Sequence, residues 1–284
     1  MQAILISAYK NQKYLERLIN FFDKKCMVYV HIDYKSDIVP ENLNVVCPQN
    51  VEIYKKYKIN WGSYSHLEAI LFLLKRALKN PNINFIHIIS GQDMPVKRLE
   101  DFNCFEKDNL IYMGHFKVTD IDPKIAIRFE HGTLFPKADQ GNKMVKIINR
   151  FYAQFHKKRE FIGEYNYNQI YKGLVWVSIP RYAAKYVINY NQKNNFCQAL
   201  YHVSIPEEFF FQTILENSPF KNNIQANSLI YNDWDKERNG SLPAILDASD
   251  YKKIINSNCF FARKIDPKIS QKLINKFSNT ITDF

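Results

Sequence analysis

The chain has 284 residues, 46% of them hydrophobic and 15% aromatic, and it carries a formal net charge of +11. This composition excludes an intrinsically disordered protein, and the length allows a substantial core in one large domain or two small ones. The positive charge predicts an anionic partner, although nucleic acid, an acidic membrane or a phosphorylated ligand would each satisfy it. No stretch approaches the roughly 18 consecutive apolar residues of a membrane-spanning helix, so we expect none.

Five cysteines are scattered without a CxxC pair, and the seven histidines form no HxxxH or HExxH motif. The sequence therefore predicts neither a disulfide framework nor a zinc site, and we expect the reducing cytoplasm as the compartment. The first nine residues lack the charged segment of a signal peptide, so we interpret them as a strand.

The N-terminal elements predict an α/β sheet. Residues 3–9 form a continuous apolar run typical of a buried parallel strand, and apolar residues then recur at helical spacing up to Phe22. A second β-rich run, 27–32, ends at Asp33, which completes a βαβ unit. Ligands bind at the carboxyl ends of strands in such sheets. Asp33 is therefore either a ligand contact or simply the turn former after its strand.

The pattern continues with a strand and loop over 53–61 and a helix over 65–79, which Asn80-Pro81 ends. Residues 85–89 are predicted as a central strand that runs into a polar turn at 90–95, again at the ligand edge. We interpret His87, which lies among isoleucines in that strand, as a hydrogen-bonded core residue. A further strand is expected over 110–116, and 118–140 is irregular.

An amphipathic helix is predicted from Met144 to Phe155. Its other face is basic, with Lys143, Lys146, Arg150, Lys157, Lys158 and Arg159. Such a helix can lie on an anionic membrane surface, but we expect a core helix with a solvated basic face. Strands are then expected over 174–179, 228–234 and 259–262, and helices over 180–190, 247–257 and beyond Pro267.

The stretch from Ser204 to Leu215 is predicted to open a buried helix. Ser204 suits an N-cap and Pro206 a first turn, and Glu207 has the spacing of a capping box that reaches back to the N–H of Ser204. Glu208 points elsewhere, because consecutive helical residues lie about 100° apart. A carboxylate at the head of a buried helix suits a general base, but it also fits simple complementation of the helix dipole.

Four segments, taken in order, resemble the core-2/I-branching β-1,6-N-acetylglucosaminyltransferase family (glycosyltransferase family 14), which also includes peptide xylosyltransferases. They are Trp61-Gly62-Ser63, residues 90–95, Pro206-Glu207-Glu208 and residues 261–266. The resemblance covers nearly the whole chain. It implies a single GT-A-like α/β domain over 1–284 with a mostly parallel central sheet flanked by helices, in which 1–116 binds the nucleotide sugar and 117–284 binds the acceptor and carries catalysis.

The resemblance also implies an inverting, metal-independent transfer of a sugar from a UDP donor to a hydroxyl of a glycan or glycolipid acceptor. N-acetylglucosamine is the first candidate for this sugar. Glu208 would be the catalytic base and Lys264 would hold the diphosphate. The other donor contacts are expected from Asp33, Ser7, Asp93 and Arg263, and the acceptor contacts from Trp234, Trp176 and Glu207. Neither a metal nor another cofactor is expected.

The sequence departs from the family at several points. Ile230 stands where many relatives have an arginine, so Arg263 or Arg238 would have to complete the diphosphate clamp. Ser7-Ala8-Tyr9-Lys10 lacks a histidine common in relatives. The membrane anchor and disulfides of the Golgi enzymes are absent from this sequence. We therefore expect a soluble bacterial-type member in the cytoplasm, with possible peripheral contact at the inner face of the membrane.

Two alternatives stay open. In a metal-dependent GT-A transferase, for UDP-xylose or another UDP-sugar, Asp33 or Asp93 would bind manganese. The other is a non-enzymatic binder of nucleic acid or anionic surfaces, which the net charge of +11 allows. The chain has no recognisable nucleic-acid-binding module and its basic residues are spread out, so we expect no nucleic-acid partner.

Overall fold

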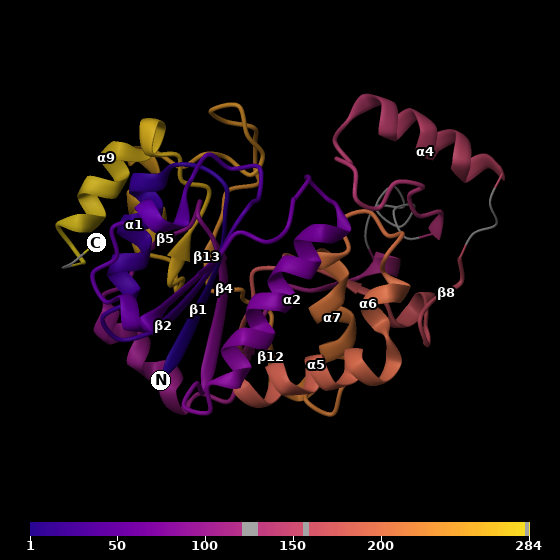
Figure 1. Ribbon diagram of the computed structural model, residues 1–284, viewed down its shortest axis with the longest axis horizontal. Helices are drawn as coiled ribbons and strands as arrows, with labels where there is room; N and C mark the ends of the chain where they lie inside the picture. Colours follow the sequence, from indigo (N-terminus) through magenta and orange to yellow (C-terminus); the bar gives the residue numbers. More distant parts are fainter. Residues whose placement is uncertain (121–129, 156–158, 282–283) are drawn as a thin grey trace.

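The computed structural model describes residues 1–120, 130–155, 159–281 and 284. The five longer helices that pack on its central sheet are α1 (Gln12–Phe22), α2 (Tyr64–Lys79), α5 (Arg181–Asn194), α7 (Glu207–Glu216) and α9 (Pro267–Ser278). Helices α1 and α9 lie on one side of the sheet and α2, α5 and α7 on the other (Figure 1). The α/β class with flanking helices is therefore confirmed.

The central sheet has seven strands, which lie side by side as β12 (Ile224–Gln225), β6 (Ile111–Tyr112), β11 (Ser178–Pro180), β4 (Phe85–Ser90), β1 (Gln2–Ala8), β2 (Met27–Ile32) and β3 (Val51–Tyr54). Strand β11 pairs antiparallel with both β4 and β6, whereas the other neighbours pair parallel. The sheet is thus mostly parallel, as predicted.

The order of the strands reverses between β1 and β4. The chain proceeds outward from β1 through β2 to β3 and then returns to β4 on the other side of β1. In open α/β sheets such a switch point leaves a crevice outside the carboxyl ends of the strands, where ligands bind. The register aligns Ser7 with both His31 and Ser90, so the ends of β1, β2 and β4 lie level with one another. Asp33 and Asp93 follow two of these ends.

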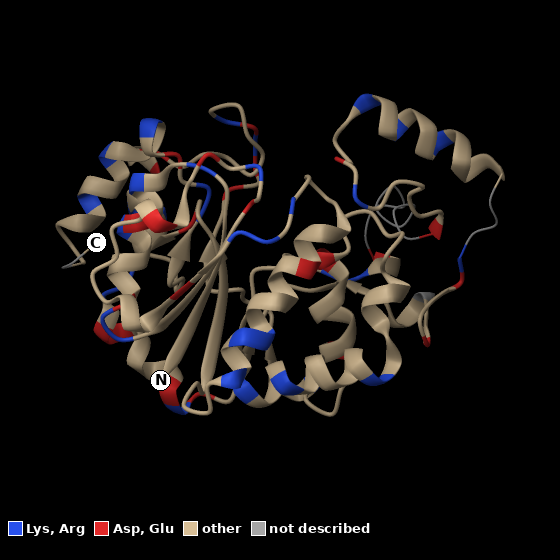
Figure 2. Ribbon diagram, viewed as in Figure 1, with Lys and Arg blue, Asp and Glu red and all other residues tan. Residues whose placement is uncertain are grey.

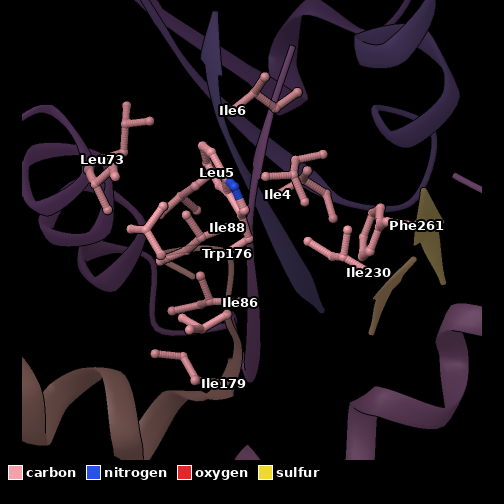
Figure 3. Close-up of a cluster of buried hydrophobic side chains, with 14 of the residues drawn as sticks. Ile4, Leu5, Ile6, Leu73, Ile86, Ile88, Trp176, Ile179, Ile230 and Phe261 are labelled. Carbon is pink, nitrogen blue, oxygen red and sulfur yellow. The ribbon is translucent and has the colours of Figure 1, made fainter. Parts of the chain in front are cut away.

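The core gathers around β1 and β4. Every residue of β4 is buried, because helices cover both faces of the sheet, and this explains its continuous apolar run. Figure 3 shows part of the core, with Trp176 in the same cluster as Leu5 and Ile88. His87 is fully buried, and its ring nitrogens lie within hydrogen-bonding distance of Ser178 Oγ (2.9 Å) and Gln2 Oε1 (3.1 Å). The interpretation of His87 as a hydrogen-bonded core residue is confirmed.

Three small sheets and several short helices complete the described chain. The sheets are β13 (Ile230–Tyr231) with β14 (Phe261–Ala262) and β5 (Met94–Pro95), β10 (Tyr171–Lys172) with β7 (Phe116–Lys117), and β8 (Phe161–Ile162) with β9 (Tyr165–Asn166). The other α-helices are α4 (Lys143–Phe155), α6 (Phe196–Ala199) and α8 (Tyr251–Ile255). The 3-10 helices are η1 (Pro40–Asn42), η2 (Pro48–Asn50), η3 (Leu99–Lys107), η4 (Val118–Asp120), η5 (Tyr167–Gln169), η6 (Lys221–Asn223) and η7 (Ala248–Asp250).

Some sequence-based expectations are wrong. The strand predicted over 110–116 divides into β6 and β7, which belong to different sheets. Helix α4 buries none of its side chains, so it is not a core helix. Part of the irregular stretch predicted over 118–140 lies outside the described residues, as do Lys157 and Lys158 of the predicted basic face. Among the helices that the structure describes, none is both long and apolar enough to cross a bilayer.

Candidate active site

Asp33 lies buried directly after β2 and organises the sheet edge around it. Its Oδ1 accepts hydrogen bonds from the backbone N–H groups of Lys35 (3.0 Å) and Ile59 (3.1 Å). Its own N–H donates to the carbonyl of Ala8 at 2.8 Å. Asp33 therefore forms the turn after its strand, which is one of the two roles that the sequence left open. Contact with a donor stays a prediction for Asp33, and for the nearby Ser7.

The small sheet β13-β14-β5 brings two predicted donor residues together. Its antiparallel register pairs Ala262 with Met94, so the next residues along, Arg263 and Asp93, lie opposite one another. Arg263 Nη1 is 3.5 Å from Asp93 Oδ1, and both side chains are buried. Burial raises the pKa of Asp93, although Arg263 and the N–H of Ser90 act in the opposite direction. The pair is loose, because neither of these two atoms has a well-formed hydrogen bond within the described chain.

Two lysines add positive charge beside this pair. Burial lowers the pKa of Lys264, and the neighbouring charges of Arg263 and Lys10 lower it further. Lys264 Nζ donates to Ser241 Oγ at 3.1 Å, and Lys10 Nζ lies 3.4 Å from Asp266 Oδ2. Three cations therefore crowd the switch-point edge, and an anion bound there would relieve their mutual repulsion. Lys10 is not among the residues predicted from the sequence. Its position two residues after β1, where ligands bind in such sheets, is the signal that could have identified it.

The two arginines suggested for the diphosphate clamp have different surroundings. Arg238 is surrounded by Asp233, Asp247 and Asp250, with its shortest contact 2.7 Å from Asp250 Oδ2. Three carboxylates already complement its charge, so Arg238 fastens a loop and is a poor phosphate ligand. Arg263 faces a single carboxylate and lies at the cationic edge. Ile230, where the resemblance implies an arginine, is buried in the core.

The Trp61-Gly62-Ser63 motif meets the start of α7. The N–H of Ile205 donates to the carbonyl of Gly62 at 2.9 Å. Gly62 has a φ of +64°, and a Cβ at this position would come within 2.9 Å of Ile205 Cγ1. Both constraints favour glycine. The Trp61-Gly62-Ser63 segment therefore contacts the residue just before Pro206-Glu207-Glu208, and the head of α2 lies beside the head of α7.

The predicted capping box of α7 is wrong. The helix begins at Glu207, its N-cap is Pro206, and no side-chain cap hydrogen bond forms. Glu207 turns instead toward α2, where its Oε1 lies 2.9 Å from Nδ1 of His66. The other oxygen, Oε2, is buried and has no hydrogen-bond partner among the described residues. A tertiary contact with His66 has replaced the local cap, and a spacing rule could not have predicted it.

Glu208, the predicted base, pairs with a lysine from a different element. Its Oε2 lies 2.8 Å from Nζ of Lys172 in β10, and both side chains are mostly buried. The N–H of Gly173 also donates to the carbonyl of Glu208 at 2.9 Å. A Cβ on Gly173 would come 1.9 Å from the carbonyl oxygen of Gly114, so only glycine lets the segment after β10 pass this close. Sequence reasoning missed Lys172, because a two-residue strand leaves no periodic signal.

A chain of contacts joins the acidic head of α7 to the cationic edge. The ring of His66 lies 5.9 Å from that of Trp176, and the guanidinium of Arg263 lies 4.5 Å from the Trp176 ring centroid. Trp176 is only 7% exposed, so in this structure it has little surface to offer an acceptor. It lies instead between Arg263, a predicted donor residue, and His66, which contacts Glu207 at the head of α7.

Trp234 is on the surface and not in the core. It follows β13, and 50% of its surface is exposed. The adjacent Asp233 belongs to the Arg238 cluster, which holds the base of this loop. Trp234 is therefore not a core residue, and its role as an acceptor platform stays a prediction.

One family model and several curated proteins match this chain. The sequence model of the family described as "Branch: Core-2/I-Branching enzyme" matches residues 3–255. The chain is 23% identical over 275 residues to "Xylosyltransferase oxt" of Drosophila pseudoobscura pseudoobscura and 24% identical over 272 residues to the Drosophila melanogaster protein of the same name. Each alignment covers 87% of this chain but 29% of the relative, so the chain spans less than a third of these proteins. Among solved structures, the galactosyltransferase LgtC in complex with donor and acceptor sugar analogues matches with a TM-score of 0.41 and 9% identity, covering 99% of this chain and 96% of that one.

Proposed function

The chain belongs to the Core-2/I-Branching enzyme family, and we propose that it is a glycosyltransferase that moves a sugar from a UDP donor to a hydroxyl of a glycan or glycolipid acceptor. One observation carries the proposal. The cationic edge formed by Lys10, Arg263 and Lys264 is joined through Trp176 and His66 to the acidic head of α7. A leaving diphosphate and an acceptor hydroxyl require these two kinds of surface side by side.

On the donor side, Lys264 and Lys10 would hold the diphosphate, with Arg263 beneath them. Ser7 and Asp33 would meet the nucleoside at the ends of β1 and β2, where the switch point opens. Cations at this place stabilise the negative charge that develops on the departing UDP. Asp93 would then act indirectly, by complementing the charge of the Arg263 guanidinium from 3.5 Å.

On the acceptor side, Glu208 would be the base of a single, inverting displacement. The acceptor oxygen forms a bond to the anomeric carbon while the bond from that carbon to the phosphate oxygen breaks. UDP leaves with the electron pair, and the hydroxyl proton passes to the Glu208 carboxylate. The ammonium of Lys172, 2.8 Å from Oε2, fixes the direction of this carboxylate. The unpaired Oε2 of Glu207 can accept a hydrogen bond from a second acceptor hydroxyl, and Trp234 would stack on the sugar.

We propose that the reaction needs no metal. Asp33 uses Oδ1 for two backbone N–H groups and Asp93 faces Arg263, so neither carboxylate is disposed to hold manganese as the metal-dependent alternative requires. Among the residues with described positions, no three His, Cys, Asp or Glu side chains form a group that could bind an ion. Lysines would supply the charge that a metal provides in other transferases.

The donor is the least constrained part of the proposal. The resemblance implies UDP-N-acetylglucosamine, whereas the names of the curated relatives make UDP-xylose the second candidate. A hydrolysis screen over UDP-linked glucosamine, galactosamine, xylose, glucuronate and glucose derivatives would identify the donor without knowledge of the acceptor. We expect UDP to be released fastest from UDP-N-acetylglucosamine or from UDP-xylose. Glu208→Gln should abolish most of that release. No release from any UDP-sugar, in a folded protein that also fails to bind UDP, would reject the proposed activity.

A further inference from the structure

We infer that α4 docks the protein on an anionic lipid bilayer, with its apolar face in the interface and its basic row against the headgroups. The inference does not depend on the proposed function, because it concerns a surface away from the candidate active site. Helix α4 has thirteen residues, of which three are basic and none is acidic. Figure 2 shows its basic positions along a helix that stands apart from the central sheet.

The apolar residues of α4 point outward. Met144, Ile147, Phe151 and Phe155 are 63%, 48%, 60% and 82% exposed. With about 100° between consecutive residues, these four positions share one stripe of the helix. An amphipathic helix on a globular protein normally buries such a stripe, but among the described residues nothing covers this one.

A basic row borders the apolar stripe. Lys143, Lys146 and Arg150 are all exposed, and their spacing of three, then four residues places them along one side of the helix. Long basic side chains beside an apolar face can reach lipid phosphates while the apolar groups enter the interface. The two stripes together complement a bilayer, which has an apolar interior and, when its lipids are anionic, negatively charged headgroups.

The orientation of α4 is fixed by polar contacts on its third side. Asn149 Nδ2 donates to Thr133 Oγ1 at 2.9 Å, and Asn149 Oδ1 accepts from the N–H of Leu134 at 3.0 Å. The helix start is capped by Asn142, whose Oδ1 accepts from the N–H of Met144 at 2.8 Å. Because Asn149 faces the protein, the apolar stripe is held away from it.

Charge favours a bilayer over a second copy of the chain. A symmetric contact would place the three cations of one α4 against those of the other, on a protein that already carries a net charge of +11. An anionic bilayer complements both stripes at once, and each juxtamembrane lysine or arginine adds about 1 kcal/mol of attraction.

The test is flotation of the full chain with vesicles of phosphatidylcholine, with and without phosphatidylserine, at low and high ionic strength. We expect binding to the phosphatidylserine vesicles that weakens with salt, and little binding to phosphatidylcholine alone. The variant Lys143→Gln/Lys146→Gln/Arg150→Gln should lose on the order of 100-fold in affinity. Phe151→Ser/Phe155→Ser should lose at least about tenfold, whereas Phe116→Ser, an equally exposed phenylalanine in β7, should bind as the wild type does.

Thermal melts would show that the α4 variants fold, since the substituted side chains are exposed. Equal binding to both vesicle types would overturn the inference, as would equal losses in the α4 and Phe116 variants. A dimer in size-exclusion chromatography that Phe151→Ser/Phe155→Ser dissociates, without any vesicle binding, would assign the surface to a second copy instead.

Discussion

Glu207 and Glu208 are neighbours in the sequence, but their side chains have different partners. Glu207 pairs with His66 of α2, and Glu208 pairs with Lys172 of β10. The helical turn between consecutive residues sends them in different directions, so they cannot share one chemical task. The family resemblance assigns proton removal to Glu208, and the contacts assign the α2–α7 connection to Glu207.

We predict that Glu208→Gln lowers kcat roughly 10²–10⁴-fold while UDP binding is retained, because the amide cannot take the acceptor proton. Glu207→Gln is the matched control. It weakens the contact with His66 and should lower stability by on the order of 1 kcal/mol and raise KM for the acceptor, while kcat stays near the wild-type value. Steady-state kinetics, UDP titration and thermal melts of the two variants check this prediction. Equal catalytic losses in both would contradict the assignment of the base.

Lys264 is the residue on which the metal-free proposal depends. We predict that Lys264→Ala weakens UDP affinity and turnover together, and that EDTA changes neither in the wild type, since the ammonium stabilises the leaving diphosphate. Lys10→Ala should show the same effects to a smaller degree, because Lys10 lies farther along the edge and partly serves Asp266. Calorimetric titration with UDP and rates measured with and without EDTA would check both. Strict dependence on added manganese would reject the metal-free mechanism.

At the scale of elements, the strong predictions were those based on long periodic segments. The βαβ unit up to Asp33 and helix α2 were predicted because their apolar spacing is local and extends over whole elements. In the candidate active site, Lys172 lies in β10, and Asp93 and Arg263 lie beside β5 and β14; these two-residue strands are too short for any periodicity. The contact of Lys172 with Glu208 and the Arg263–Asp93 pair could therefore be recognised only in the three-dimensional structure. In helix α4, the apolar period of the sequence predicts an apolar face, but it does not predict what packs against that face.

The loop after β13 supplies a prediction at this scale. Trp234→Ala should raise KM for the acceptor about tenfold or more, since an indole face stacked on a sugar is lost, while donor hydrolysis and Tm stay near wild type because Trp234 is half exposed. Arg238→Met is the contrasting variant. It leaves Asp233 and Asp250 without their cation and should lower the free energy of unfolding by on the order of 1–3 kcal/mol. A large drop in Tm for Trp234→Ala, or an unchanged acceptor KM, would show that the loop is not the acceptor platform.

At the scale of the whole molecule, the fold places neutral histidines in its sheet and cations at one of its edges. His31 and His87 lie in adjacent regions of the same sheet, on β2 and β4, and both are fully buried. Burial lowers the pKa of His31 to about 4 and that of His87 to about 3. The Nε2 of His31 accepts a hydrogen bond from the N–H of Tyr57 at 3.0 Å, which requires the neutral ring nitrogen. Acid should therefore destabilise the fold by protonating buried histidines in the sheet, in addition to protonating surface carboxylates.

The last prediction concerns stability against pH. In the unfolded chain both histidines take up a proton near pH 6.5, whereas in the folded protein they resist protonation until about pH 4 and pH 3. The unfolded state thus binds more protons than the folded state below about pH 6.5. The free energy of unfolding therefore has its full value above that pH and falls as the pH decreases toward 4. Each histidine contributes a slope of up to about 1.4 kcal/mol per pH unit. Urea unfolding at a series of pH values would measure the combined slope, and His87→Gln should reduce it by about half whatever its own baseline stability. His31→Gln provides the parallel measurement. A free energy of unfolding that is flat between pH 6.5 and 4, or a slope that neither variant changes, would show that these rings do not control the acid response.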